Sequence, residues 1–454
     1  MKPLFLCVFK KAPETIERTC FQMKNFLFLV FFLSTAIAFA QDKPKEINTE
    51  FYGFVRYEAF WDTYKGLNAA NEQFFVLPLY AGADVNGKHI NETPTYNFSS
   101  MATRVGVRIS GPVIFNAKTS ANIETDFAGD LGNNPAMFRV RQAHVVFSWP
   151  NSSLLVGQTW HPFWSGKVFP TVGGLNTGCP FQPFNRSPQI RYDYKAGKIV
   201  TLSAALVSEF QYKSYGFTKI ESMTQAGMTI DKTDAFTRNS GIPEITANIE
   251  ANSGGFTAGA GTSLKYIKPT LYTVGTSGKY VSDDLVKGVS WMGYAQYVKK
   301  LFTIRGKAVL GQNMAYLTIP GGYGVKSVAS STGAMSYTPY NTFTSFINAV
   351  YGKKYEFGLF AGYLKNLGTS DALYNFSSGS SSSAVTLGIT PNVASIYRVS
   401  PHFALNVSKL RLVFEYELTS ARYGTGTIDL SDGLYHSSVN ATNHRGQLML
   451  TYFF

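Results

Sequence analysis

Short segments in which apolar and polar residues alternate recur along almost the whole chain. In the last of them, Leu450, Tyr452 and Phe454 lie on one side of an extended strand. Gln447 and Thr451 lie on the other side. A period of two is typical of a β-strand with one apolar face, so the chain is predicted to be all-β.

The alternating segments are about ten residues long, which is enough to cross a bilayer in a tilted barrel. Clear examples are residues 103–110, 119–127, 243–250, 302–310 and 410–418. Strands are predicted to begin near residues 51, 103, 118, 137, 153, 189, 199, 243, 255, 289, 301, 342, 355, 395, 409 and 444. We therefore predict a closed transmembrane antiparallel β-barrel of about 16 strands. Residues 73–80 could add to this count and give 18, although Pro78 favours a loop there.

The connections between these strands alternate strictly in length. The short ones are residues 111–117, 150–152, 196–198, 251–254, 299–300, 352–354 and 408. The long ones are residues 63–102, 128–136, 161–188, 208–242, 265–288, 312–341, 364–394 and 419–443. This pattern predicts short periplasmic turns at one rim and long extracellular loops at the other, as in bacterial outer-membrane barrels.

The N-terminal residues predict export. Lys24 is followed by an apolar stretch, residues 26–33, and by an Ala-x-Ala pattern at residues 38–40. The stretch is too short for a membrane-spanning helix. We predict a signal peptide in residues 1–40 with its true start at Met23, a short periplasmic segment in residues 41–50, and an outer-membrane barrel in residues 51–454.

Composition agrees with an exported barrel. Charged residues make up 15% of the chain, against about 25% in an ordinary soluble domain. The formal net charge is +13, of which residues 41–454 carry +10. Because the arginines alternate with apolar residues and do not cluster, we expect anionic solutes or a membrane surface as partners and no nucleic acid.

Chemistry-bearing residues do not form a recognisable catalytic or metal site in the sequence. Cys179 is the only cysteine after residue 40, and the six histidines lack metal-ligand spacing. No motif pairs a serine nucleophile with a histidine base. We expect neither a cofactor, nor a metal, nor an enzymatic activity.

The strand pattern also assigns charged residues to the inner face of the barrel. The pore-lining candidates are Arg56, Arg104, Arg108, Glu124, Asp126, Arg191, Arg305, Lys307, Arg398 and Arg411. A lumen with excess Arg and Lys favours anions, but the arginines could instead pair with facing carboxylates and merely hold the wall together. The parity changes near Arg141 and Gln142, and a β-bulge there would reconcile it, so the orientation of Arg139 and Arg141 stays open.

A sixteen-stranded barrel leaves an aqueous channel unless something narrows it. The third long connection, residues 161–188, is rich in aromatic, proline and glycine residues. Exposed rings are costly in water, so we predict that this loop folds inward and constricts the pore. The candidate residues of the constriction are Phe163, Trp164, Lys167, Phe181 and Arg186. The alternative is an external loop that packs against a neighbouring subunit.

Two motifs carry a resemblance to a known family. Residues 139–145, Arg-Val-Arg-Gln-Ala-His-Val, are followed by residues 155–160, Leu-Val-Gly-Gln-Thr-Trp. Together with residues 123–127, they resemble the DcaP-like family of trimeric outer-membrane porins. The resemblance implies a sixteen-stranded homotrimer that takes up small anionic solutes such as dicarboxylates. Members of that family often carry an N-terminal coiled coil, for which residues 41–50 leave no room.

The sequence therefore predicts an outer-membrane porin for small hydrophilic, preferably anionic solutes. Its expected partners include outer-membrane lipid, lipopolysaccharide and the barrel-assembly machinery. The signal for that machinery is predicted at Leu450, Tyr452 and Phe454. The alternatives are an adhesin or structural barrel and a barrel-embedded hydrolase.

Overall fold

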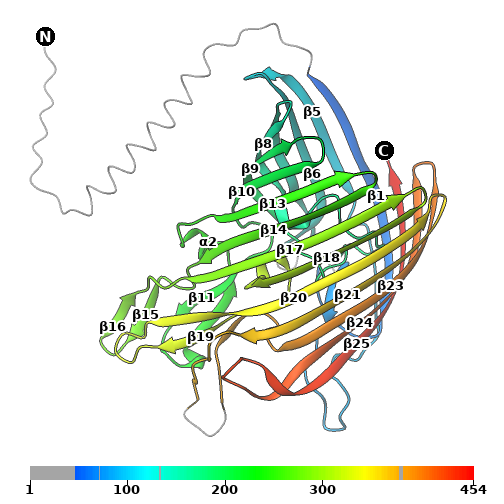
Figure 1. Cartoon of the computed structure of the whole chain (residues 1–454). Coiled ribbons are helices and arrows are strands. Elements are labelled where there is room, and N and C mark those ends of the chain that lie inside the picture. Colours follow the sequence, from blue (N-terminus) through cyan, green and yellow to red (C-terminus); the bar gives the residue numbers. More distant parts are fainter. Residues whose placement is uncertain (1–46, 71, 132–133, 378–381) are drawn as a thin grey trace, which may run out of the picture.

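The structure is a computed structural model that describes residues 47–454 except residues 71, 132–133 and 378–381. Within these residues, sixteen antiparallel strands form one closed ring (Figure 1). They are β1 (Asn48–Asp62), β5 (Arg104–Ile114), β6 (Ala117–Leu131), β7 (Asn134–Ser148), β8 (Ser152–Trp160), β9 (Arg186–Ala196), β10 (Val200–Val207), β13 (Glu244–Ser253), β14 (Phe256–Ile267), β17 (Val286–Lys299), β18 (Phe302–Gln312), β20 (Met335–Gly352), β21 (Tyr355–Thr369), β23 (Val393–Val407), β24 (Leu410–Ile428) and β25 (Tyr435–Phe453). The ring closes because β1 pairs with both β5 and β25. The prediction of a sixteen-stranded barrel is confirmed, whereas the predicted signal peptide lies outside the described residues.

The strands begin within three residues of the predicted starts except in two cases, whereas β21 and β24 end beyond their predicted ends. β20 begins seven residues and β25 nine residues before the predicted starts at residues 342 and 444. In both cases the added segment pairs with a neighbouring strand beyond the lipid-facing part of the wall. β25 therefore reaches 19 residues. Residues 435–443 are mostly polar and show no alternating pattern, because there is no lipid beside them to select one.

The short connections are tight hairpins at one rim. Phe115 and Asn116 both have positive φ, 52° and 58°, and so do Gly254 and Gly255, 57° and 84°. Two successive residues with positive φ form the turn whose twist matches that of a β-hairpin. Both ends of the described chain lie at this rim, as β1 and β25 show in Figure 1.

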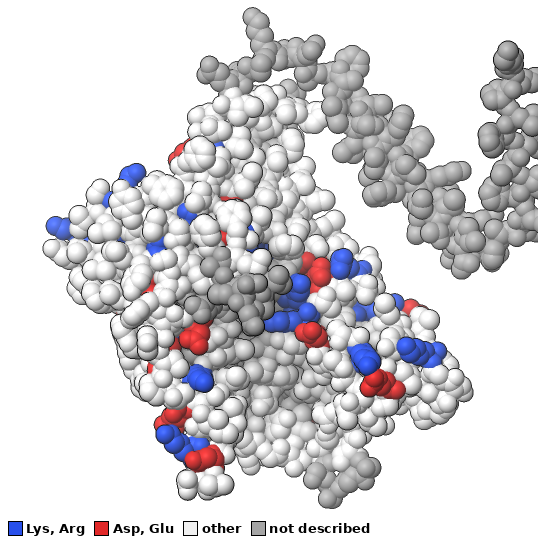
Figure 2. Space-filling view, turned by 180° about the vertical axis from the view of Figure 1, so that it is seen from behind, with Lys and Arg blue, Asp and Glu red and all other residues white. Residues whose placement is uncertain are grey.

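The outer face of the strands is apolar and exposed, as expected for a lipid-facing wall. Trp291, Phe357 and Leu359 are 58%, 58% and 48% exposed. On the face seen in Figure 2, wide areas of the surface carry no charged side chain. At the periplasmic end, Leu450, Tyr452 and Phe454 are also exposed, on the side that the sequence pattern predicts.

Shorter elements lie in the long connections. They are β2 (Gly66–Ala69), β3 (Phe74–Pro78), β4 (Thr95–Ser99), η2 (Pro162–Trp164), β11 (Tyr215–Ile220), η3 (Gln225–Gly227), β12 (Met228–Lys232), α2 (Ala235–Arg238), β15 (Tyr272–Gly275), β16 (Gly278–Val281), η4 (Ala315–Leu317), β19 (Gly321–Val328) and β22 (Thr386–Ile389). None of the helices in the described part of the chain is both long and apolar enough to cross a membrane. Residues 74–78 form a hairpin with β2 and do not join the barrel, so the alternative of 18 strands is not needed.

Candidate functional site: the lumen and its infolded loop

The third long connection, residues 161–185, lies inside the barrel. Phe163, Trp164, Phe181 and Phe184 are at most 4% exposed. Trp164 stacks on Trp160 of β8 with ring centroids 4.1 Å apart and ring planes 8° apart. Burying one large apolar side chain stabilises a fold by about 1.5–3 kcal/mol, so these rings supply the free energy that keeps the loop inside.

Inward-pointing cations of β18 hold the first part of this loop. The ammonium group of Lys307 donates to the carbonyl oxygens of Phe163 and Trp164, at 3.2 and 2.6 Å. Arg305 donates to the carbonyl oxygen of Phe169 at 2.6 Å. The sequence predicts both cations on the inner face, which is where they lie. The loop buries Lys307 and only partly covers Arg305.

Carboxylates of β24 hold the middle of the loop. Glu415 accepts hydrogen bonds from the backbone N–H groups of Gly173 and Gly174, at 2.6 and 3.1 Å. A Cβ atom on Gly173 would lie 1.9 Å from the methyl group of Met449, so a larger residue would require the Met449 side chain to move. Glu417 accepts a hydrogen bond from the side-chain amide of Asn176 at 3.0 Å.

Carboxylates of β13 hold the start of the loop. His161 lies 3.1 Å from Glu244, and Lys167 forms an ion pair with Glu250. Together with the contacts to β18 and β24, these bonds tie the loop to the wall from β13 round to β24.

The hairpin of β2 and β3 is a second insertion into the barrel, which the sequence analysis did not predict. Phe74, Phe75 and Leu77 are at most 3% exposed. Arg398 of β23 donates to the carbonyl oxygen of Val76 at 2.9 Å. The apolar run at residues 74–77, inside a connection that is otherwise polar, is the signal that could have revealed it.

The two insertions leave space along the opposite wall, from β5 to β9. A cavity of about 940 Å³ lies there. Its charged lining residues are Arg104, Arg139, Arg141, Arg186, Lys213, Lys232 and Asp234. A second cavity of about 530 Å³ lies nearer the short turns and is lined by polar residues of β1 and β5–β9, including Arg108, His144 and Arg191.

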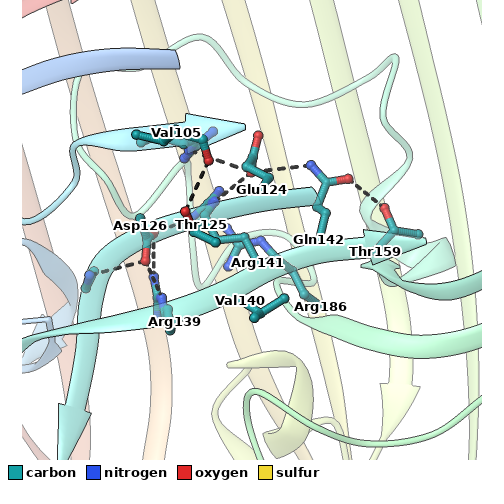
Figure 3. Close-up of polar contacts among 12 residues, drawn as sticks. Val105, Glu124, Thr125, Asp126, Arg139, Val140, Arg141, Gln142, Thr159 and Arg186 are labelled. Carbon is teal, nitrogen blue, oxygen red and sulfur yellow. Dashed lines mark hydrogen bonds and ion pairs between the residues drawn. The ribbon is translucent and has the colours of Figure 1, made fainter. Parts of the chain in front are cut away.

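Arginines and carboxylates of β6 and β7 form a network beside the larger cavity (Figure 3). Arg139 binds Asp126 through two hydrogen bonds of 2.7 and 3.0 Å. Arg141 bridges Glu124 and Asp126, at 2.7 Å each. Arg104 lies 3.7 Å from Glu124. Asp126 and Glu124 therefore orient three guanidinium groups, and one positive charge of this network is left uncompensated.

A β-bulge makes this network possible. Glu124 pairs with Gln142 and Thr125 pairs with Val140, so the register between β6 and β7 skips Arg141. Without the extra residue, Arg139 and Arg141 could not share a face with Gln142 and His144. The predicted bulge is confirmed, and both arginines point inward.

Arg186 differs from the other arginines of the cavity. Its side chain is 2% exposed overall, and its guanidinium carbon lies 4.0 Å from the centre of the Trp160 ring. It donates to the side-chain oxygen of Gln211 at 2.7 Å, and its Nε atom is buried without a hydrogen-bond partner. In the described part of the chain, no carboxylate lies within ion-pair distance of it. The structure assigns Arg186 to the start of β9, two residues before the predicted end of the loop.

The other predicted inward arginines are paired with carboxylates or bound to the insertions. Their partners are Glu58 and the carbonyl of Gly173 for Arg56, Glu50 for Arg108, Asp193 for Arg191, Glu417 and the carbonyl of Cys179 for Arg398, and Glu356 for Arg411. The alternative that the arginines pair with carboxylates and hold the wall together therefore applies to much of the barrel. It does not apply to Arg186.

Two groups of the loops near the cavity stay neutral. Burial raises the pKa of the Tyr212 phenol to about 12, so it adds no negative charge to the cavity that it lines. Burial also raises the pKa of the Cys179 thiol to about 12. A buried neutral thiol is unreactive.

A closed sixteen-stranded antiparallel barrel is the fold of outer-membrane porins. No protein-family model and no curated protein matches the chain. The outer membrane channel DcaP of Acinetobacter baumannii is similar in structure, with 17% sequence identity and a TM-score of 0.60, over 90% of this chain and 97% of that chain. OmpT of Vibrio cholerae, an outer-membrane protein, has 11% identity and a TM-score of 0.50, over 91% of this chain and 99% of that chain. These similarities confirm the porin fold, and the predicted resemblance to the DcaP-like family is confirmed at the level of the fold.

Proposed function

We propose that this protein is a porin of the bacterial outer membrane through which small hydrophilic solutes diffuse passively, with a preference for anions. One observation carries the proposal. The space beside the infolded loop is lined by six basic residues and one acidic residue, in the described part of the chain. We further propose a homotrimer, as the resemblance to the DcaP-like family implies.

The physical basis of the preference is the charge that remains after pairing. Arg104, Arg139, Arg141 and Arg186 face the cavity, and Glu124 and Asp126 compensate two of these four charges. A fixed positive charge in a narrow space with apolar walls raises the local concentration of anions. An unpaired buried cation is costly in free energy, and a passing anion lowers that cost.

Arg186 is the residue that tests the preference most directly. Arg186→Gln removes the positive charge. Arg186→Lys keeps the charge but loses the planar stacking on Trp160. Lys219→Gln makes the same change of charge on β11, where the side chain is 62% exposed and already paired with Glu221. Each variant is reconstituted in a planar bilayer, and the zero-current potential is measured in a salt gradient.

We expect the wild-type zero-current potential to indicate anion preference. Arg186→Gln should move it toward zero, Arg186→Lys should stay near the wild type, and Lys219→Gln should leave it unchanged. The shift should be largest at low salt, because charges are screened over about 10 Å at 0.1 M. A cation-selective wild-type channel would contradict the proposal. Swelling of liposomes in small sugars separates a porin from an adhesin, since a closed barrel passes no solute.

A further inference from the structure

A row of polar residues crosses four neighbouring strands on the outer face of the barrel. Lys365 of β21 pairs with Ser395 of β23, and Ser395 pairs with Arg422 of β24. Arg422 pairs with Asn440 of β25. Because paired residues share a face of the sheet, these four side chains lie at one height along the wall, on the strands at the right of Figure 1.

The alternation within each strand shows that the row points outward. On β21, Lys365 follows Tyr363, which is 43% exposed, while Leu364 between them is fully buried. On β24, Arg422 is exposed, while Ala421 and Tyr423 on either side of it are buried. The two cations therefore face away from the lumen.

The row lies at the edge of the lipid-facing zone. Immediately on its periplasmic side, Tyr363 pairs with Tyr397, and both rings are exposed. Outer-membrane barrels carry girdles of aromatic residues where the hydrocarbon ends and the headgroups begin. Lys365 and Arg422 are thus placed at headgroup height, on the side of the long loops.

A cavity of about 270 Å³ lies over this row. Lys365, Arg422 and Ser438 line it, and segments 391–394 and 433–435 cover it from the loop side. Arg422 donates from Nε to the hydroxyl of Ser438 at 2.6 Å, which leaves its two terminal nitrogens available. Among the described residues, no carboxylate lines the cavity or lies within ion-pair distance of Lys365 or Arg422.

Two other cations of the long connections show the alternative arrangement, in which a carboxylate pairs with the cation. Lys326 pairs with Asp371 at 2.8 Å, and Lys219 pairs with Glu221. Two unpaired cations in a shared cavity repel each other, and an anion between them removes that repulsion.

We propose that the cavity binds a phosphate group of lipopolysaccharide, the phosphorylated glycolipid of the outer leaflet. This inference rests on the proposed location in the outer membrane. A guanidinium group binds phosphate through two parallel hydrogen bonds, an ammonium adds a point charge, and hydroxyl and amide groups suit the sugar that carries the phosphate. The exposed Tyr363 lines the cavity, and Lys365 and Arg422 point away from the lumen, which favours a lipid phosphate over a free one.

The test measures binding of lipopolysaccharide to the purified, delipidated barrel in detergent. The variants are Lys365→Gln with Arg422→Gln as a double variant, Arg422→Lys as the conservative variant, and Lys219→Gln as the control of equal charge change elsewhere. Heat-modifiable migration on a gel shows that each variant is folded. We expect the double variant to bind at least about tenfold more weakly, because hydrogen bonds to charged groups are the strong ones. Arg422→Lys should bind with intermediate affinity.

Two further arms identify the ligand group. Dephosphorylated lipopolysaccharide should bind to the wild type as weakly as the intact glycolipid binds to the double variant. Inorganic phosphate at the same concentration should not displace the glycolipid. Equal binding by the wild type and the double variant, undiminished binding of the dephosphorylated glycolipid, or displacement by inorganic phosphate would each overturn the inference. The Arg186→Gln measurement contains no lipopolysaccharide, so failure of the proposed function is seen separately.

Discussion

The two sides of the lumen use the same kind of residue for different purposes. On the side from β13 to β24, charged side chains bind the backbone of the inserted loop, as Lys307 and Glu415 do. On the side from β5 to β9, Arg141 and Arg186 border an open cavity. The sequence pattern places Lys307 on the inner face, leaves the orientation of Arg141 open and assigns Arg186 to the loop. It cannot tell which inward charges the loop covers, because a period of two reports only the face of the sheet.

The difference shows that a charged side chain on the inner face of the barrel does not necessarily act on solutes in the pore. A cation that donates to carbonyl oxygens is removed from solvent. The carbonyl dipoles offset most of the electrostatic potential that it would otherwise produce in the pore. A cation beside an aqueous cavity acts on whatever enters. Selectivity should therefore follow from the β5–β9 side alone, whereas pore size and loop stability should follow from the β13–β24 side.

The largest expected effect comes from removing the loop itself. Deleting residues 168–185 should raise the single-channel conductance by on the order of twofold or more, because a barrel of this size is wide enough for an aqueous channel once nothing fills it. Conductance in planar bilayers measures the change, and heat-modifiable migration on a gel verifies that the variant is folded. A folded variant with unchanged conductance would place the constriction elsewhere, with the β2–β3 hairpin as the next candidate.

A pair of isosteric substitutions tests the comparison directly. Glu124→Gln, on the open side, removes a negative charge next to Arg141 and should shift the zero-current potential toward stronger anion preference. Glu417→Gln, on the covered side, should leave that potential nearly unchanged and lower the free energy of unfolding by roughly 1–3 kcal/mol, because Arg398 and Asn176 lose a charged partner. Equal shifts of the potential in both variants would show that the loop does not isolate the covered side.

The smallest effect concerns the reactivity of Cys179. At pH 8, a thiol with a pKa of about 12 is ionised to only about one part in ten thousand, and burial also blocks access. Labelling of the folded wild type by a maleimide should therefore be very slow. Lys307→Met leaves the carbonyl oxygens of Phe163 and Trp164 unpartnered and should loosen the loop, so labelling should become faster. Equally slow labelling in that variant would mean that the aromatic contacts alone hold the loop. The labelling rate of Arg305→Met, which removes the other cation of β18, is measured for comparison.

Much of the fold could be predicted because a membrane barrel imposes a strict local rule on its strands. Leu450 and Tyr452 face lipid because their strand has an apolar side, and the short turns follow from chain geometry. Where lipid is absent the rule fails, as at the loop end of β25. The β2–β3 hairpin was missed because its burial depends on Arg398 and Asn176, which are distant in the sequence.

The sequence by itself determined the closed barrel, the strand number, the inner and outer faces, the bulge beside Arg141 and the aromatic loop that enters the lumen. Each of these follows from residues that are near one another in the chain. Only the tertiary structure decided which inward charges the loop covers, that Arg186 is left without a carboxylate, and that Lys365 and Arg422 share an outward cavity. These depend on which distant groups meet, and the pairing of a charge depends on distances across the whole barrel.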